Sequence, residues 1–181
     1  GHFANIIDIG GGQGIAITTD GVGTKTLIAE ALGKYDTIGI DCVAMLANDL
    51  LCVGATPLAM VDCVSFGKSR NDIMPSILDG LIEGARQANI AIVGGETAVL
   101  RHVVNDNAFD IAGAAIGSVY LDKVITGKAI VPGDIVVGIE SNGIHANGMT
   151  LAKNVLFGDF DLKSPGNSFA GDHELKHELL L

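Results

Sequence analysis

Residues 15–33 read IAITTDGVGTKTLIAEALG, and this stretch decides what kind of fold the chain can form. The β-branched run from Ile15 to Thr19 predicts a strand, and a glycine-rich turn follows it at residues 20–23. From Thr24 to Leu32 the apolar residues recur with helical spacing, and Gly33 is a typical helix stop. The stretch therefore predicts a strand, a tight turn and a helix.

The rest of the chain predicts helices and strands in alternation. Helices are indicated by apolar residues with helical spacing from Asp41 or Cys42 to Val53 and over residues 73–85. The second of these has Asn71 or Asp72 as its predicted cap and Pro75 in its first turn. Strands are indicated by β-branched and apolar runs at residues 58–66, 90–93, 109–120 and 135–139. This order of elements predicts an α+β (mixed α/β) fold.

Composition excludes several classes of protein. Hydrophobic residues fill 48% of the 181 positions and the mean hydropathy is +0.43, which excludes a disordered chain. With 11 basic against 21 acidic residues and no cluster of Lys and Arg, no nucleic acid partner is expected. No apolar run approaches the ~20 residues of a membrane span, so no membrane partner is expected. Three cysteines outside any CxxC pair favour a reducing, cytoplasmic location.

The turn after the first predicted strand is the first candidate site. Its sequence, Asp20-Gly21-Val22-Gly23-Thr24-Lys25, offers a phosphate several backbone N–H groups, a helix N-terminus and a lysine charge. Asp20 adds a carboxylate of the kind that binds Mg²⁺. The alternative is a tight turn that carries an exposed Lys25. The spacing matches neither a Walker A loop nor a dinucleotide-binding fingerprint.

Polar residues on the second predicted helix form another candidate group. Asp41 and Asn48 are seven positions apart, so they share a helix face. Asp49 lies among leucines, where an unpaired carboxylate is costly to bury. It therefore either points to solvent as part of a polar stripe or is neutralised by a cation. Asp62 poses the same question, because alternation places it on the apolar face of its strand.

Two polar segments follow predicted strands. Gly94-Gly95-Glu96-Thr97 comes after the strand at residues 90–93, where two glycines allow a ligand to approach and Glu96 offers a carboxylate. The alternative is a structural turn. Residues 141–148 read SNGIHANG and follow the strand at residues 135–139. His145 in this loop is a candidate acid, base or phosphate donor, against the alternative of a loop histidine without a chemical role.

Four blocks, in this order, resemble one known family. They are residues 20–62 (beginning DGVGTKTLIAEALGKYDTIGID), GLIEGARQANIAIVGGETA at 80–98, FDIAGAAIG at 109–117 and PGDIVVGIESNGIHANG at 132–148. Together they resemble the phosphoribosylformylglycinamidine cyclo-ligases, the aminoimidazole ribonucleotide synthetases of purine biosynthesis. The likeness is greatest to the archaeal branch of that family and extends over nearly the whole chain.

The resemblance implies a function and a set of site residues. The implied reaction is the ATP-dependent closure of the imidazole ring of formylglycinamidine ribonucleotide, with ATP and Mg²⁺ as cofactors. The implied catalytic residues are Lys25 and His145, and the implied metal ligands are Asp20, Asp41 and Asp49. The residues implied to bind ATP are Asp20, Gly21, Gly23, Thr24, Lys25, Asn48, Asp49, Gly95, Glu96 and Thr97.

The resemblance also implies a domain organisation. Residues 1–157 would form an N-terminal ATP-binding and dimerisation domain, and residues 158–181 a linker and the start of a C-terminal α/β domain. In the family, two such N-terminal domains share a barrel across a homodimer. That arrangement would account for the Ala- and Gly-rich strand at residues 111–119, since small residues allow another backbone to approach closely.

Two alternatives stay open at this point. One is another ATP-dependent enzyme of the same superfamily, such as formylglycinamide ribonucleotide amidotransferase, thiamine-monophosphate kinase or selenophosphate synthetase. The other is that the 181 residues alone are a non-catalytic dimerisation and nucleotide-binding module. Turnover with each substrate would separate the enzymes, and sedimentation with an assay of ADP release would test the module.

Overall fold

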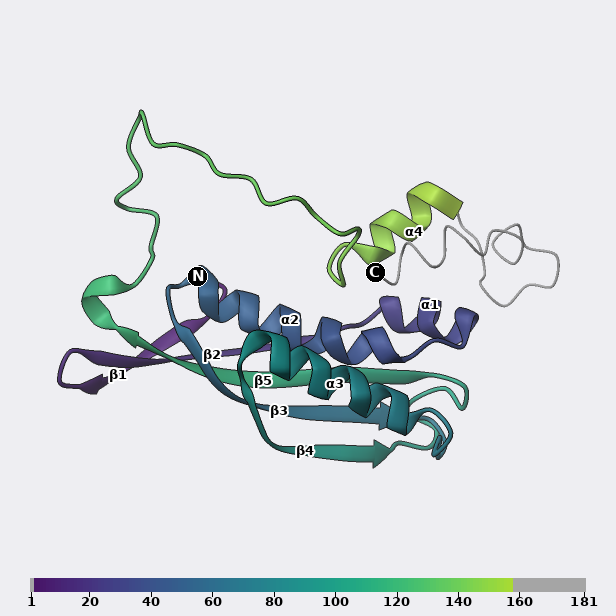
Figure 1. Cartoon of the computed structure of the whole chain (residues 1–181). Helices are drawn as coiled ribbons and strands as arrows, with labels where there is room; N and C mark the ends of the chain where they lie inside the picture. The colour runs from purple at the N-terminus through teal and green to yellow at the C-terminus, as the bar shows by residue number, and fades with distance from the viewer. Residues whose placement is uncertain (1, 158–181) are drawn as a thin grey trace.

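The computed structural model describes residues 2–157, which form a five-stranded mixed sheet with helices (Figure 1). The strands are β1 (Asn5–Gly10), β2 (Gln13–Gly21), β3 (Thr56–Phe66), β4 (Ala91–Val99) and β5 (Phe109–Tyr120). The helices are α1 (Lys25–Leu32), α2 (Asp36–Cys52), α3 (Met74–Ala88) and α4 (Met149–Phe157), with a 3-10 turn at Leu121–Lys123. The strand order is β1-β2-β5-β3-β4, and only β3 and β4 run parallel. The mixed α/β class predicted from the sequence is confirmed.

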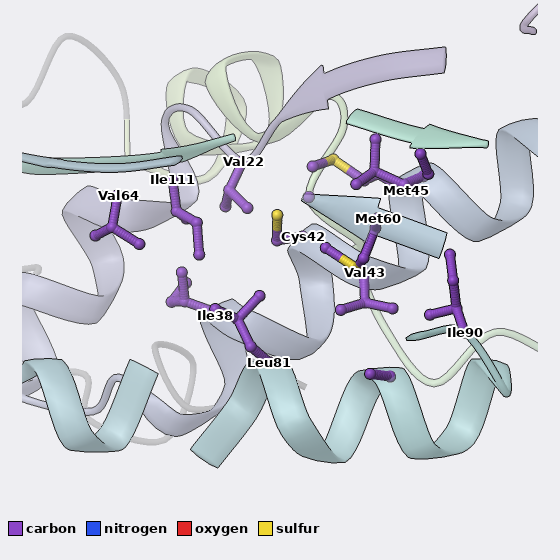
Figure 2. Packing of buried hydrophobic residues seen from close by; sticks show 14 of the residues in the cluster. Val22, Ile38, Cys42, Val43, Met45, Met60, Val64, Leu81, Ile90 and Ile111 are labelled. Atoms are coloured by element: carbon purple, nitrogen blue, oxygen red, sulfur yellow. The ribbon is translucent and has the colours of Figure 1, made fainter. Parts of the chain in front are cut away.

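The core lies between the sheet and the helices that cover one of its faces. Helices α1, α2 and α3 are all on the same side of the sheet (Figure 1), with α2 against β2, β3 and β5 and α3 against α2. Figure 2 shows Ile38 and Val43 of α2 meeting Leu81 of α3, with Val64 of β3 and Ile111 of β5 on the sheet side. Each such buried aliphatic side chain stabilises the fold by about 2 kcal/mol.

Two glycines allow α2 and α3 to cross at close range. A Cβ atom at Gly39 of α2 would overlap the backbone of Gly80 and Leu81, and a Cβ atom at Gly80 of α3 would overlap the carbonyl of Asp36. Any larger residue at either position would push the helices apart. This contact fixes α2 against the rest of the core, and α2 carries three of the candidate site residues.

The other face of the sheet has no helix on it within residues 2–157. Side chains of β5 alternate between buried residues on the helix face and more exposed ones on this second face, which includes Ile116. Exposed apolar side chains of neighbouring strands share that face, among them Ile7, Ile17 and Val61. We call this surface the open face of the sheet. It carries apolar area that the described chain does not cover.

The helices that the sequence predicts are present, with corrections at their starts. Helix α2 begins at Asp36, not at Asp41 or Cys42, because its apolar face continues back to the fully buried Ile38. Helix α3 contains Pro75 in its first turn as expected, but neither Asn71 nor Asp72 caps it. The Asp72 carboxylate instead pairs with Arg70 at 3.3 Å.

The strands show larger differences from the sequence prediction. The strand expected at residues 90–93 continues to Val99. The sequence pattern does not predict β1. A turn at Gly10–Gly12, where φ is 87°, 64° and 77°, joins β1 to β2. The strand predicted at residues 135–139 is wrong. Ile135 is 89% exposed and Ile139 94%, since no strand of the described chain pairs with this segment. None of the helices within residues 2–157 is both long and apolar enough to cross a membrane.

Candidate functional site

The glycine-rich turn joins the end of β2 to the start of α1. The N–H of Gly21 donates to Oδ1 of Asp20 at 2.8 Å, and Gly23 has a φ of 62°, which favours glycine. The Thr26 hydroxyl donates to the Gly23 carbonyl at 2.8 Å and closes the turn. Thr24 immediately precedes α1, but its side chain makes no capping bond to the helix. In the first turn of α1 the N–H groups of Thr26 and Leu27 instead donate to the carbonyls of Gly23 and Thr24, at 3.0 and 3.1 Å.

The glycine-rich turn and the segment around α4 line one hollow. Residues Gly21–Thr24 form one wall, and residues 146–151 with Asn154 form the other, around about 630 Å³. The hydroxyls of Thr24 and Thr150 lie 2.7 Å apart although 126 positions separate them. Figure 1 shows α4 beside α1 on the helix side of the sheet. The fold therefore brings together the first and last of the sequence blocks.

Lys25 is fully buried and paired with Asp41 of α2. Its ammonium nitrogen lies 3.0 Å from Oδ1 and 2.9 Å from Oδ2 of that carboxylate. The side chain of Lys25 has no exposed surface and that of Asp41 is 13% exposed. Burial raises the pKa of Asp41, while the positive charge of Lys25 and, more weakly, His145 opposes the rise. The alternative of an exposed lysine in a simple turn is therefore wrong.

Asp49 of α2 faces β2. The Thr18 hydroxyl donates a 2.7 Å hydrogen bond to Oδ2 of Asp49. Thr18 and Asp20 point to the same side of β2, about 7 Å apart along the strand. Asp49 and Asp20 therefore share the space between β2 and α2. Of the two earlier readings of Asp49, a residue of an outward polar stripe does not fit this contact.

Asn48 lies apart from Asp49 although the two are adjacent in sequence. It is exposed and lines a separate hollow of about 350 Å³ between α2 and α3, together with Gly84 and Gln87. A helix turns about 100° per residue, so neighbouring side chains face different directions. The structure does not bring Asn48 to the hollow at the glycine-rich turn.

A row of register partners crosses four strands on the helix face. Asp20 of β2 pairs with Gly113 of β5, which pairs with Asp62 of β3, which pairs with Gly95 of β4. Burial raises the pKa of Asp62. A Cβ atom at Gly95 would lie 2.5 Å from Oδ1 of Asp62, so glycine leaves the space that this carboxylate occupies. Strand alternation in the sequence was the signal that marked Asp62.

Several carboxylates act on the buried thiol of Cys42 in α2. Burial raises the pKa of Cys42 to about 12, and the charges of Asp62, Asp110, Asp20 and Asp41 contribute in the same direction. Asp110 lies on the open face of the sheet, so this shared influence does not place the four carboxylates in one site. Asp62 was not among the predicted metal ligands.

The segment Gly94-Gly95-Glu96-Thr97 lies inside β4, so it is a strand and not a turn after one. Gly95 and Thr97 are the partners of Asp62 and Val64, which places them on the helix face. Glu96 is the partner of Cys63 and so lies on the open face. Glu96 and Asp20 are therefore on opposite faces of the sheet.

His145 lies in an irregular segment between β5 and α4. Its Nε2 atom is 3.3 Å from the Ser141 hydroxyl, and the side chain is exposed. The next residue, Ala146, is buried and lines the hollow at the glycine-rich turn. His145 is thus near the Lys25–Asp41 pair without a hydrogen bond to either residue.

The three carboxylates expected to bind Mg²⁺ make different contacts. Within residues 2–157, no group of three or more His, Cys, Asp or Glu side chains is arranged to hold a metal ion. Asp41 is held by Lys25, whereas Asp20 and Asp49 each have one oxygen in a hydrogen bond and a second that accepts none from a described residue. Mg²⁺ in nucleotide sites often takes only one or two carboxylates besides phosphate oxygens. Asp20 and Asp49 fit that requirement.

This fold and site define a mixed α/β domain with helices on one face of the sheet and a glycine-rich turn that lines a hollow together with the start of α4. Residues 1–119 match the family described as "AIR synthase related protein, N-terminal domain", and the chain belongs to that family. Residues 158–181, predicted as a linker and the start of a second domain, lie outside the described residues.

Curated relatives agree with this assignment. The chain is 57% identical over 162 residues to a phosphoribosylformylglycinamidine cyclo-ligase of Thermococcus kodakarensis, covering 90% of this chain and 48% of the relative. It is 54% identical over the same length to the enzyme of that name from Pyrococcus furiosus, with the same coverage. The chain thus spans about half the length of these relatives.

A solved structure shares the fold at low identity. The structure described as "HypE-HypF complex" aligns with 96% of this chain and 54% of its own chain, at a TM-score of 0.62 and 24% identity. At that identity the likeness supports the fold alone.

Proposed function

We propose that this chain is the nucleotide-binding half of an enzyme that closes the imidazole ring of formylglycinamidine ribonucleotide with ATP. The observation that carries the proposal is the identity of 57% and 54% to two enzymes named for that reaction, extending over 90% of the chain. The site supports it, because the glycine-rich turn and the SNGIHANG loop, two blocks typical of the family, line one hollow.

The glycine-rich turn is proposed to hold the phosphates of ATP. Gly21, Gly23 and Thr24 line the hollow, and the N-terminus of α1 adds partial positive charge beside it. Lys25 would supply a full charge to the same phosphates. Its present partner is Asp41, so contact with phosphate requires the ammonium group to leave that pair or share it. The proposed roles of Gly95 and Thr97 rest on their place on the helix face.

Asp20 and Asp49 are the carboxylates proposed to hold Mg²⁺. The ion would neutralise phosphate charge during transfer, which is the main demand of phosphoryl transfer on a protein. Asp41 was expected as a third ligand, and its contact with Lys25 instead favours the role of counter-ion. Asn48 and Glu96 would need a second chain or a rearrangement to meet the nucleotide, because they lie on other surfaces.

The proposed reaction has two steps. First, the formyl amide oxygen of the substrate attacks the γ-phosphorus, the bond to the β-phosphate oxygen breaks, and ADP leaves. Second, the ring-forming nitrogen attacks the formyl carbon, the carbon–oxygen bond breaks, phosphate departs and the nitrogen loses a proton. His145, which precedes Ala146 in the lining of the hollow, is proposed to take or supply the proton in the second step.

The open face of the sheet is proposed to pair with that of a second copy, giving a homodimer with a shared barrel. Ile7, Ile17, Val61 and Ile116 expose apolar surface there, and single soluble domains rarely leave such a contiguous patch uncovered. Glu96 lies on the same face, so the dimer would place it at the junction of the two copies. Residues 1–157 are accordingly proposed as the ATP-binding and dimerisation domain of a cytoplasmic enzyme.

A substrate panel tests the proposed function. The full-length protein is given ATP and Mg²⁺ with formylglycinamidine ribonucleotide, formylglycinamide ribonucleotide plus glutamine, thiamine monophosphate or selenide. Release of ADP or, with selenide, of AMP is measured in each case. The proposal expects release only with formylglycinamidine ribonucleotide, together with one aminoimidazole ribonucleotide per ADP. Release with a different substrate alone would assign the protein to another activity.

A further inference from the structure

The hydroxyl of Thr18 is the hydrogen-bond donor that the structure gives to the Asp49 carboxylate. The distance from Oγ1 to Oδ2 is 2.7 Å, which is typical of a hydroxyl that donates to a carboxylate. Oγ1 also lies 3.4 Å from the carbonyl of Phe3. A hydroxyl has one proton, and the shorter contact takes it. The Thr18 hydroxyl therefore donates its proton to Asp49 and not to the Phe3 carbonyl.

The location of Thr18 holds its hydroxyl in place against Asp49. Thr18 is 6% exposed, so water does not compete freely for its hydroxyl. A β-branched side chain in a strand has restricted χ1, which holds the hydroxyl in place. The bond uses Oδ2 of Asp49, and Oδ1 accepts no hydrogen bond from a described residue. Asp20 lies two positions further along the same face of β2.

We propose that Thr18 is a positioning residue for the metal site: its hydroxyl fixes the Asp49 carboxylate so that the second oxygen is available to Mg²⁺ beside Asp20. This inference rests on the proposed function, in which Asp49 is a metal ligand. The physical basis is general, because ligating carboxylates are themselves held by hydrogen bonds whose loss lowers metal affinity about 10- to 100-fold. The competing role is a structural link between β2 and α2.

The neighbouring Thr19 provides a matched control. Its hydroxyl also makes a hydrogen bond, 2.8 Å to the carbonyl of Gly113, but its side chain lies on the opposite face of β2. Thr18→Val and Thr19→Val are the same chemical change at adjacent positions, and valine is well suited to a strand. Thr18→Ser keeps the hydroxyl. If Thr18→Val does not fold, Thr18→Ala takes its place, since it removes the hydroxyl together with the γ-methyl group and adds no atom.

The readout is the Mg²⁺ concentration at the midpoint of thermal stabilisation by a saturating non-hydrolysable ATP analogue, measured on the full-length protein. Thr18→Val is expected to raise this midpoint about tenfold or more, with Thr19→Val unchanged and Thr18→Ser close to wild type. A lower melting temperature without ligand and an unchanged midpoint would overturn the inference in favour of the structural link.

Asp49→Asn tests the positioning role of Thr18 and the metal role of Asp49 separately. If Thr18 acts through Asp49, Thr18→Val adds no further shift of the midpoint in the Asp49→Asn background. An additional shift of the full size there would overturn the positioning role. If Asp49→Asn itself leaves the wild-type midpoint unchanged, the proposed metal role of Asp49 fails. A shift with Asp49→Asn but none with Thr18→Val leaves that role standing and rejects only the inference about Thr18.

Discussion

The Lys25 ammonium lies 2.9 Å from the nearer oxygen of Asp41, and no part of the Lys25 side chain reaches solvent. This ion pair joins the first turn of α1 to α2 directly behind the glycine-rich turn. Two charges removed from water depend on each other far more than a surface pair does. The contact therefore couples the geometry of the candidate phosphate site to the stability of the domain.

Removal of Asp41 is predicted to destabilise the fold strongly. Asp41→Leu leaves the buried Lys25 without a counter-ion, and the free energy of unfolding should fall by about 3–5 kcal/mol. The double variant Lys25→Met/Asp41→Leu should recover most of this loss, because an apolar pair of similar volume replaces two buried charges. Urea denaturation of both proteins and of Lys25→Met measures the coupling. Equal stability of Asp41→Leu and the wild type would show that Lys25 does not need its partner.

Glycine is predicted to be required at position 95 because the Asp62 carboxylate occupies the space of a Cβ atom there. In Gly95→Ala the new Cβ atom would meet the Asp62 carboxylate, whose side chain must turn aside, and a loss of about 1 kcal/mol is expected from the displaced rotamer. Gly94→Ala is the matched control, since its Cβ atom would meet only Val61 at 3.8 Å. The loss from Gly95→Ala should disappear in an Asp62→Ala background. Denaturation curves for the four variants check this, and equal losses at Gly94 and Gly95 would refute it.

Asp49→Asn is predicted to separate stability from ligand response. Asparagine can still accept the hydrogen bond from Thr18 through its amide oxygen, and it removes a negative charge from the side of β2 that also carries Asp20. The melting temperature without ligand should equal or exceed that of the wild type. Stabilisation by Mg²⁺ with ATP should be mostly lost, because a neutral amide replaces a carboxylate poorly as a Mg²⁺ ligand. A variant with a lower melting temperature and a normal response to Mg²⁺ and ATP would make Asp49 a structural residue.

The open face of the sheet is predicted to hold two copies together. Ile116 is 38% exposed beside its register partner Ile17, which is 39% exposed. Ile116→Glu would place charges at the centre of the proposed interface and should give monomers in sedimentation velocity experiments. Ile82→Glu, on α3 and 63% exposed, makes the same change on the helix side and should leave the dimer intact. Dimers that persist with Ile116→Glu would place the interface elsewhere.

Local sequence patterns were sufficient for some elements and insufficient for others. The strand, turn and helix over residues 15–33 and the bounds of β5 were predictable, because alternation, helical spacing and glycine positions act over a few residues. The run at residues 135–139 has the composition of a strand, but a strand also needs a partner that composition does not supply. Asp36–Ile40 was missed as helix because its β-branched residues favour strands unless tertiary packing holds them in a helix.

The candidate site was predictable as a set of residues but not as an arrangement. Motif spacing selected Asp20, Lys25 and Asp49, whereas the burial of Lys25 depends on Asp41 sixteen positions away in a different helix. The contact of Thr24 with Thr150 depends on the path of the whole chain. The side of the sheet on which Glu96 lies follows from strand register, which becomes known only when β3 and β4 are paired.

The fate of the formyl oxygen tests the central claim most directly. Formylglycinamidine ribonucleotide labelled with ¹⁸O in its formyl group is converted by the full-length protein with ATP and Mg²⁺, and the released phosphate is analysed by mass spectrometry. The proposed mechanism predicts one ¹⁸O atom in each phosphate, because the formyl oxygen is phosphorylated and leaves with the phosphoryl group. Unlabelled phosphate released together with aminoimidazole ribonucleotide would contradict phosphorylation of the amide, and no product at all would contradict the proposed function.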